Sequence, residues 1–218
     1  MGKISNLTEE QQIIFREVGK NEYTRQHFYF SGGTALSAFY LNHRYSEDLD
    51  FFSKEKFDNQ VIFTLMEEWS RRHHFHTQSR MFEVVYKFDL VFPHDTPLKV
   101  DFSYYPYKQL EPGTTVESVK IDSLLDIAVN KVVTVSQRTE VKDFVDLYFL
   151  LQKFSIWDLL QGAKVKFGLD IEPFLLAADF LKIDDFTYLP RMTEPLTLEE
   201  IKSFYRQRAT DLGKQSVK

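Results

Sequence analysis

A glycine pair between two strand patterns constrains the fold more than any other feature of the chain. The aromatic run 27–31 reads as a strand, Gly32-Gly33-Thr34 follows at once, and 34–41 has the character of a short helix. Glycines ahead of a helix let a phosphate group approach backbone N–H groups without a Cβ in the way. The block therefore predicts a strand–turn–helix unit that contacts phosphate through Gly32, Gly33 and Thr34.

Three aspartates lie on the strands predicted next along the chain. Asp48 and Asp50 stand where the strand 49–53 begins, and Asp101 interrupts the apolar strand 98–105. Residues one apart on a strand point to the same side, so two such carboxylates can share a divalent metal ion. An all-carboxylate site suits Mg²⁺ or Mn²⁺ better than zinc. We expect Asp48, Asp50 and Asp101 to form a metal site for a nucleoside triphosphate.

Simpler interpretations of these acids stay open. Asp48 and Asp50 have the spacing of a strand-edge turn in which one aspartate caps a helix. Asp101 has Lys99 and Lys108 nearby in sequence, and either one would make an ion pair at a strand end.

Composition narrows the class of protein. The 218 residues include 21 Phe and 11 Tyr, enough for one substantial, aromatic-rich core, and no cysteine, which excludes disulfides and thiolate zinc sites. A net charge of −5 argues against a generic nucleic-acid coat protein. Met1–Asn6 lacks an apolar signal region and no apolar run reaches the roughly 18 residues that span a bilayer. We expect a cytoplasmic protein without a membrane partner.

The secondary-structure pattern changes from mixed to helical near Asp122. Before it we expect helices at 8–20 and 58–74, a hairpin of strands 80–92 and 98–105, and a strand at 116–121. After it we expect helices at 122–137, 140–153, 155–167, 173–181 and 197–211. The predicted fold is α/β (α+β): a mixed sheet with flanking helices in 1–121, then a helical domain in 122–218 that closes a nucleotide cleft.

Charged residues on two of these helices are unusual for their positions. Lys131 and Arg138 share one face of the helix 122–137 with apolar residues, and Asp143 and Asp146 are neighbours on the next helix. Either acid is placed to pair with either cation. The alternative is that the cations reach solvent at the edge of the face.

The most basic stretch is Arg71-Arg72-His73-His74-Phe75-His76, followed by Arg80. It has the composition of a contact for a nucleic-acid backbone, or of a solvated helix end. Its histidines are too crowded for the usual i, i+4 metal pair, and the chain has neither a Walker-type loop nor a Gly-x-Gly-x-x-Gly fingerprint.

Motifs spread over about residues 27–152 resemble the AbiEii/AbiGii-type nucleotidyltransferase-like toxins of the DNA polymerase β-like nucleotidyltransferase superfamily. The blocks that carry the resemblance are Gly32-Gly33-Thr34-Ala35-Leu36, Arg44-x-Ser46-x-Asp48-Leu49-Asp50-Phe51, Lys131, and Lys142-Asp143-x-x-Asp146-Leu147. Lys142 stands where the family is expected to have arginine. A lysine keeps the positive charge of arginine but lacks its bidentate fork. Residues 155–218 carry no such motif.

The resemblance implies an activity and a set of roles. The enzyme would be a nucleotidyltransferase that moves a nucleoside monophosphate from a nucleoside triphosphate to a hydroxyl, with tRNA or another RNA as the leading acceptor. It would be the toxin of a type IV toxin–antitoxin or abortive infection system, with an antitoxin as partner. Arg44 and Ser46 would lie near the nucleotide, Lys131 would reach phosphate oxygens, and Asp146, with Asp143, would close the site.

Two other functions remain open from the sequence. The first is a nucleotide-binding regulatory or interaction protein without transfer activity, and the presence of all three acids argues against it, because such a protein can lose its metal ligands without penalty. The second is a nucleotidyltransferase whose acceptor is a protein or a small molecule, which the modest basic content leaves open.

Overall fold

The computed structural model describes residues 4–215, and the chain divides into two compact units. One unit comprises Met1–Tyr40, Ser46–Lys108 and Pro112–Ser123, and the other comprises Leu41–Tyr45, Gln109–Glu111 and Leu124–Lys218. Residues 1–3, part of the stretch judged to lack a signal region, and 216–218, the end of the predicted helical domain, lie outside the described residues.

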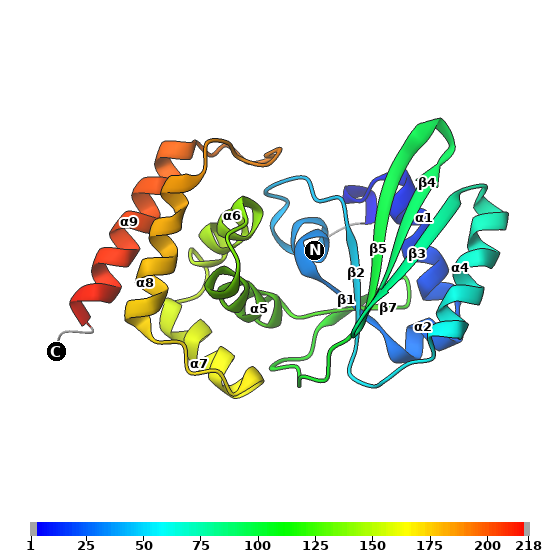
Figure 1. Ribbon diagram of the computed structural model, residues 1–218, viewed down its shortest axis with the longest axis horizontal. Coiled ribbons are helices and arrows are strands. Elements are labelled where there is room, and N and C mark those ends of the chain that lie inside the picture. The colour runs from blue at the N-terminus through cyan, green and yellow to red at the C-terminus, as the bar shows by residue number, and fades with distance from the viewer. Residues whose placement is uncertain (1–3, 216–218) are drawn as a thin grey trace. The chain divides into compact units, whose positions relative to one another are not determined.

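The first unit, the α/β unit, is a seven-stranded mixed sheet with helices (Figure 1). Its strand order is β3-β4-β5-β2-β1-β7-β6, with β2 parallel to β5 and β1 parallel to β7. The elements, in chain order, are η1 (Ile4–Asn6), α1 (Glu9–Lys20), α2 (Glu22–His27), β1 (Tyr29–Ser31), α3 (Gly32–Leu36), the π-helical turn η2 (Ser37–Leu41), β2 (Leu49–Ser53), α4 (Asn59–His73), β3 (His76–Phe82), β4 (Val85–Phe92), η3 (Pro93–Asp95), β5 (Thr96–Tyr104), β6 (Thr114–Val116) and β7 (Val119–Ile121).

One face of this sheet is aromatic and the other is polar around its centre. Phe51 of β2 stacks on Phe102 of β5 with ring centroids 5.3 Å apart, and Phe30 of β1 contacts Phe15 of α1. All four rings are buried, so α1 packs on the aromatic face. Because successive strand residues alternate between faces, Asp50 of β2, next to Phe51, projects from the opposite face.

The second unit, the helical unit, consists of α5 (Leu124–Gln137), α6 (Val141–Leu150), α7 (Ile156–Phe167), α8 (Pro173–Leu181), η4 (Lys182–Asp185) and α9 (Leu198–Gln215). Tyr205 of α9 is the centre of its core. The Tyr205 ring lies between Phe144 of α6 and Phe180 of α8, and its hydroxyl donates to the Phe144 carbonyl at 2.7 Å. Burial and the charges of Asp146 and Asp143 raise the pKa of Tyr205 well above its ordinary value, so the hydroxyl stays a donor.

Two short segments from the first half of the chain belong to the helical unit. In the segment Leu41–Tyr45, the His43 carbonyl accepts from the Thr193 amide at 2.9 Å, and Tyr45 donates its amide to Arg191. In Gln109–Glu111, the amide of Leu110 donates to the Asp126 carboxylate at 3.0 Å. Asp126 also pairs with the equally buried Lys166 at 2.7 Å, so this acid fixes the segment to α5 and α7.

The mixed α/β fold and most helix limits agree with the prediction. Capping boxes stand at the start of two helices, with Thr8 and Gln11 at α1 and Thr197 and Glu200 at α9. The strand predicted over 80–92 is wrong, because a turn with Glu83 at φ 45° divides it into β3 and β4. The predicted strand 116–121 is likewise split, and its two parts form the hairpin β6–β7. The helix predicted over 34–41 begins two residues earlier and turns into η2.

Among residues 4–215, no helix combines the length and the apolar character that a bilayer crossing requires.

Candidate active site

Asp50 and Asp101 are direct neighbours on the polar face of the sheet. Strands β2 and β5 run parallel with Asp50 opposite Asp101 in the register. Neighbouring strands lie roughly 4.8 Å apart, so the two carboxylates leave the sheet side by side. Asp101 is also opposite Lys87 of β4, whose Nζ lies 3.2 Å from Asp101 Oδ2. Lys87 is therefore the lysine that pairs with Asp101, rather than Lys99 or Lys108.

The electrostatics of Asp101 bring Asp48 into the same site. Burial raises the pKa of Asp101, the Lys87 charge lowers it, and the negative charges of Asp48 and Asp89 raise it again. The net effect is a pKa above the ordinary value of an aspartate. The charge of Asp48 is thus one of the causes that raise the pKa of Asp101.

Gly32 allows Asp50 its position. A Cβ built on Gly32 would stand 2.2 Å from Asp50 Oδ2, and Gly32 has φ +77°, a conformation that favours glycine. The glycine predicted to approach phosphate thus lies directly against the carboxylate predicted to hold metal. Gly32 therefore cannot carry a side chain for two reasons: a Cβ would clash with Asp50, and the backbone has a positive φ.

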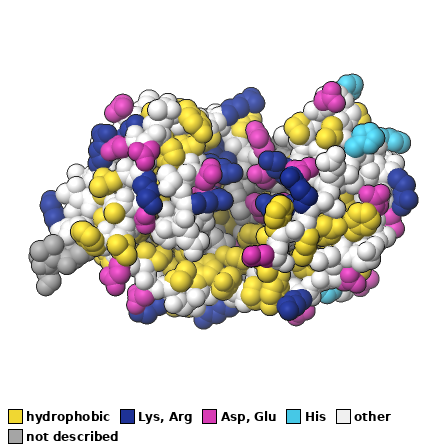
Figure 2. All heavy atoms as spheres, viewed as in Figure 1, with side chains coloured by type: hydrophobic (Ala, Val, Ile, Leu, Met, Phe, Trp, Pro, Cys, Tyr) yellow, Lys and Arg dark blue, Asp and Glu magenta, His cyan; other side chains and the backbone are white. Residues whose placement is uncertain are grey.

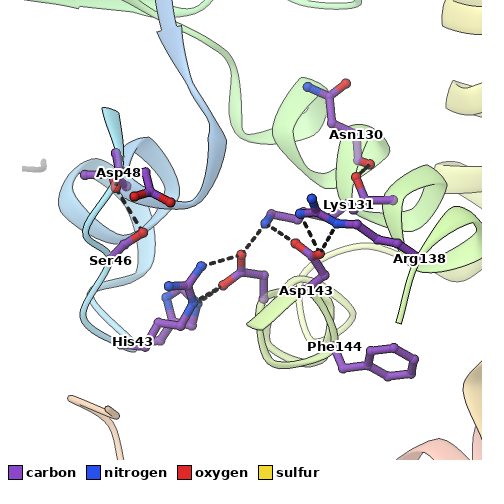
Figure 3. A network of polar contacts seen from close by, with 12 residues as sticks. His43, Ser46, Asp48, Asn130, Lys131, Arg138, Asp143 and Phe144 are labelled. Carbon is purple, nitrogen blue, oxygen red and sulfur yellow. Dashed lines mark hydrogen bonds and ion pairs between the residues drawn. The ribbon is translucent and has the colours of Figure 1, made fainter. Parts of the chain in front are cut away.

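Hydrogen bonds fix the loop that carries Asp48. The Thr34 hydroxyl donates to the Asp48 carbonyl oxygen and lies 2.9 Å from Ser46 Oγ. The Gln11 side-chain amide donates to the carbonyls of Ser46 and Glu47 at 2.9 and 3.0 Å. The side chains of Thr34 and Ser46 therefore hold this loop, of which Figure 3 labels Ser46 and Asp48. Gly33, at the second position of α3, completes the predicted block.

The donor set fits a hard divalent cation, although the described residues do not gather it around one point. No three His, Cys, Asp or Glu side chains within residues 4–215 are close enough together to hold a metal ion. Asp48, Asp50 and Asp101 offer only carboxylate oxygens, the ligands that Mg²⁺ and Mn²⁺ prefer. The negative charge of Asp48 disfavours ionised Asp101, and Lys87 offsets part of this repulsion. A bound cation would relieve the rest.

A second cluster of charges is buried in the helical unit (Figure 3). The Asp146 carboxylate accepts from Arg44 Nε at 2.6 Å and Nη2 at 2.9 Å, and Lys131 Nζ and His43 Nε2 lie 2.5 and 2.8 Å from it. Lys131 Nζ is also 2.7 Å from Asp143, which binds Arg138 at 2.8 Å. The predicted pairing of these acids with Lys131 and Arg138 is confirmed.

The charge states in this cluster follow from its geometry. Burial raises the pKa of Asp146, but the nearby charges of Lys131 and Arg44 and the bonds from His43 and Arg44 hold it well below the ordinary value. Burial lowers the pKa of Lys131, and the charges of Asp146 and Asp143 raise it to above its ordinary value. Asp146 is therefore an anion and Lys131 a cation, and Lys131 is buried rather than reaching solvent.

This geometry gives Asp146 a positioning role. Its side chain is fully buried, and its two oxygens receive bonds from Arg44, Lys131 and His43. Arg44 in turn directs its guanidinium to Asp146 and to the Tyr45 carbonyl. The predicted contacts of Arg44 and Lys131 with nucleotide and phosphate stay predictions.

Sequence reasoning missed His43 and Lys87. His43 is completely buried, its ring packs against Phe149, and its Nδ1 has no hydrogen-bond partner among the described residues. Its place next to Arg44 was the available signal. Lys87 has no local signal, because its partner lies on a strand whose pairing the sequence does not specify.

The basic stretch forms ion pairs in this structure. Arg72 and His73 both contact the buried Glu17 of α1, and Arg80 pairs with Asp89 of β4. His74 ends α4 in a left-handed conformation. These contacts favour the interpretation of a helix end over a backbone contact for nucleic acid.

The fold and the carboxylate-bearing sheet define the class as a nucleotidyltransferase-type α/β protein. A family model described as nucleotidyl transferase AbiEii toxin, type IV TA system, matches residues 19–214. The chain belongs to this AbiEii family, which confirms the resemblance. The match extends well beyond residues 27–152 and includes the helices that carry no recognised motif.

One relative and two solved structures are similar to this chain. An uncharacterized protein of Aquifex aeolicus (strain VF5), aq_aa25, is 36% identical over 142 residues, which is 63% of this chain and 64% of the relative's length. The crystal structure of JHP933 from Helicobacter pylori matches with TM-score 0.54 at 20% identity over 99% of this chain and 97% of that one. MenT4, a nucleotidyltransferase toxin from Mycobacterium tuberculosis H37Rv, matches with TM-score 0.58 at 15% identity over 92% and 82% of the chains. The two structures show a shared fold.

Proposed function

We propose that this chain transfers a nucleoside monophosphate from a metal-bound nucleoside triphosphate to a hydroxyl group of an RNA, tRNA being the first candidate. The observation that carries the proposal is the register of Asp50 against Asp101 on parallel strands, with Asp48 near enough to raise the pKa of Asp101. Family membership supports the reaction class. The RNA acceptor rests on the family's expected substrate.

In this mechanism Asp48 and Asp50 would hold the divalent ion, Mg²⁺ or Mn²⁺, and Asp101 would complete its ligand set. The bound ion would supply charge neutralisation for the triphosphate and activation of the attacking hydroxyl. Asp101, with its raised pKa, is suited to accept the proton that this hydroxyl loses. The acceptor oxygen bonds to the α-phosphorus, the bond to the β-phosphate breaks, and pyrophosphate leaves. Gly32 keeps the space over Asp50 free of a side chain.

The helical unit contributes fixed positive charge in this proposal. Asp146 and Asp143 hold Lys131 protonated, and Arg44 binds Asp146. We assign to Lys131 the phosphate contact predicted from the family resemblance and to Asp146 the orientation of Arg44 and Lys131. Asp146 is thus a positioning residue.

Labelling tests the proposal directly. The purified protein is incubated with Mg²⁺ and each α-labelled nucleoside triphosphate in turn, together with total RNA and cell-lysate protein. We expect label in RNA, its loss in Asp48→Ala and in Asp50→Ala, and its retention in Asp170→Ala, which removes an exposed carboxylate of the helical unit. Label in protein or in a small molecule would replace RNA as the acceptor. Nucleotide binding without label anywhere would identify a binding protein instead.

Family membership also supports a toxin with a cognate antitoxin. The expected result is that expression of the chain stops growth, that Asp48→Ala does not, and that co-expression of the antitoxin gene restores growth. Unchanged growth on expression of active enzyme would contradict the toxin assignment.

A further inference from the structure

Two adjoining hollows lie within the helical unit where α7, α8 and α9 meet. The first, about 280 Å³, is lined by apolar side chains such as Trp157, Phe180 and Leu212 and by charged residues of α9. The second, about 410 Å³, is lined by the segment 151–157 and by Arg208. Both include Ile156, Trp157 and Arg208 in their walls. Their volumes are comparable with those of ligand pockets, which begin at about 300 Å³.

Trp157 presents an aromatic surface in these hollows. Its side chain is 43% exposed, whereas the only other tryptophan, Trp69 of α4, is 2% exposed and belongs to a core. An indole ring is among the largest apolar surfaces a protein can bury, so a half-exposed one at a concave site is suited to stacking on a flat ligand.

Three cations line the same hollows as this ring. Arg208 stacks over Phe204 at 5.0 Å, and in the part of the chain that the structure describes no carboxylate pairs with Arg208, Lys153 or Lys214. Other cations of the same unit behave differently, because Arg206 binds Asp184 and Lys182 binds Asp179. Among the described residues that line the walls the one acid is Asp211, whose carboxylate accepts from the Gln207 side-chain amide at 2.9 Å. The hollows thus have surplus positive charge beside an aromatic platform.

This combination is specific to a local site. The chain carries a net charge of −5, and on the face shown in Figure 2 lysines and arginines are interspersed with acidic and apolar side chains. A polyanion would gain little from such a surface as a whole. It would gain from a site where cations and an exposed aromatic ring coincide.

We propose that these hollows bind a short single-stranded segment of the acceptor RNA, with a base stacked on Trp157 and neighbouring phosphates on Arg208 and Lys153. The ligand chemistry is a nucleotide unit, a flat base joined to a phosphate. The choice of RNA over a free nucleotide rests on the proposed function, and the site itself rests on the hollows, the ring and the cations. Lys214 offers a further phosphate contact.

Binding of a fluorescently labelled single-stranded RNA hexamer, measured by anisotropy, tests the site. Loss of stacking in Trp157→Ala should weaken binding about tenfold or more. Arg208→Ala should weaken it and reduce the slope of log K against log salt by about 0.7, the value for one phosphate contact on a single strand. Matched controls are Phe174→Ala, which removes an aromatic ring 63% exposed on α8, and Arg25→Ala, which removes an exposed cation of α2. Binding by Trp157→Ala within twofold of the parent protein would overturn the proposal.

Trp157→Phe separates stacking from folding. The phenyl ring keeps a stacking surface, so this variant should bind the hexamer within a few-fold of the parent, even if Trp157→Ala lowers the melting temperature. Loss of binding in Trp157→Phe equal to that in Trp157→Ala would contradict stacking. In the parent, the hexamer should also quench Trp157 fluorescence.

Two further arms identify the ligand and separate this site from catalysis. Adenosine monophosphate should bind at least tenfold more weakly than the hexamer, and equal affinity would replace RNA with a free nucleotide. Asp48→Ala should bind the hexamer like the parent protein, because its change lies in the α/β unit. If the chain transfers no nucleotide, hexamer binding that depends on Trp157 would still support the RNA site. If the enzyme is active and Trp157→Ala binds the hexamer as the parent protein does, the RNA site is refuted.

Discussion

Replacing Asp146 with asparagine measures what the buried ion cluster contributes to the fold. Asp146 is completely buried, Arg44 is 4% exposed, and the Lys131 side chain is 10% exposed, so solvent screens little of their interaction. Removing one partner of a buried pair costs about 3–5 kcal/mol because the other charge remains buried. Asparagine retains the shape of the aspartate side chain, and Lys131 keeps its ion pair with Asp143. The loss of unfolding free energy in Asp146→Asn should therefore be near the lower end of this range.

The assay is thermal unfolding at pH 7, followed by far-UV circular dichroism. In a chain of this size 1 kcal/mol shifts the melting temperature by about 2–4 °C, so Asp146→Asn should lower that of the helical unit by roughly 6–12 °C. The control is Asp170→Asn, which breaks the exposed pair with Lys164 and should leave the melting temperature within about 2 °C. A shift in Asp146→Asn no larger than that of the control would refute the reasoning.

Acidification provides a second readout of the same variant. The pKa of Asp146 is lowered in the folded protein, so its contribution is fully present above the unfolded pKa, about 3.9, and is lost as pH falls towards the folded value. The difference in unfolding free energy between parent and Asp146→Asn should stay constant from pH 7 to about 5. It should narrow below pH 4, and a constant difference down to pH 2 would show that the carboxylate charge is not responsible.

Three other changes test the α/β site. Gly32→Ala should abolish transfer and lower the stability of the fold, because the new Cβ would meet Asp50 Oδ2. The control is Gly168→Ala, where φ is +68° and no atom lies within 4 Å of the new Cβ. This control variant has the same backbone strain without the clash and should stay active. Lys87→Met removes the charge that lowers the pKa of Asp101, so the acidic limb of the pH–rate profile should move to higher pH. If this limb does not move, the titration of Asp101 is not its cause. Chelation of divalent ions should stop transfer and added Mg²⁺ should restore it, whereas full activity in excess chelator would refute the metal assignment.

Local signals predicted the elements well and the pairings poorly. The starts of the helices at Thr8 and Thr197 and the strand at 49–53 depend on neighbours within four residues, and the structure has them within one residue of the predicted bounds. The division of 80–92 depends on a turn at Glu83 that holds no glycine or proline, so composition gave no sign of it. Lys87 joins Asp101 through a strand pairing, which is a property of the whole sheet.

The site residues divide in the same way. Asp48, Asp50 and Gly32 were identified from a contiguous pattern, and their contacts are local to one strand, one turn and one loop. The contiguous motif that contains Arg44 and Asp50 nevertheless contributes to two units. Arg44 belongs to the helical unit, where it binds Asp146 of α6. Ser46 belongs to the α/β unit, where it bonds to Thr34 of α3. A linear pattern cannot show such a division, since it depends on which distant residue each side chain contacts.

Each unit has its own cluster of charged side chains, and each cluster mixes acids with cations. In the α/β unit Asp101 pairs with Lys87, and the charge of Asp48 raises the pKa of Asp101, which in the proposed function suits this cluster to a divalent ion. In the helical unit Asp146 pairs with Arg44 and Lys131, and Asp143 pairs with Lys131 and Arg138. The net charge of −5 for the whole chain does not show these local groups. Arg138 is half exposed while its partner Asp143 is buried, so in the proposed function it is the cation of this cluster most open to a phosphate group.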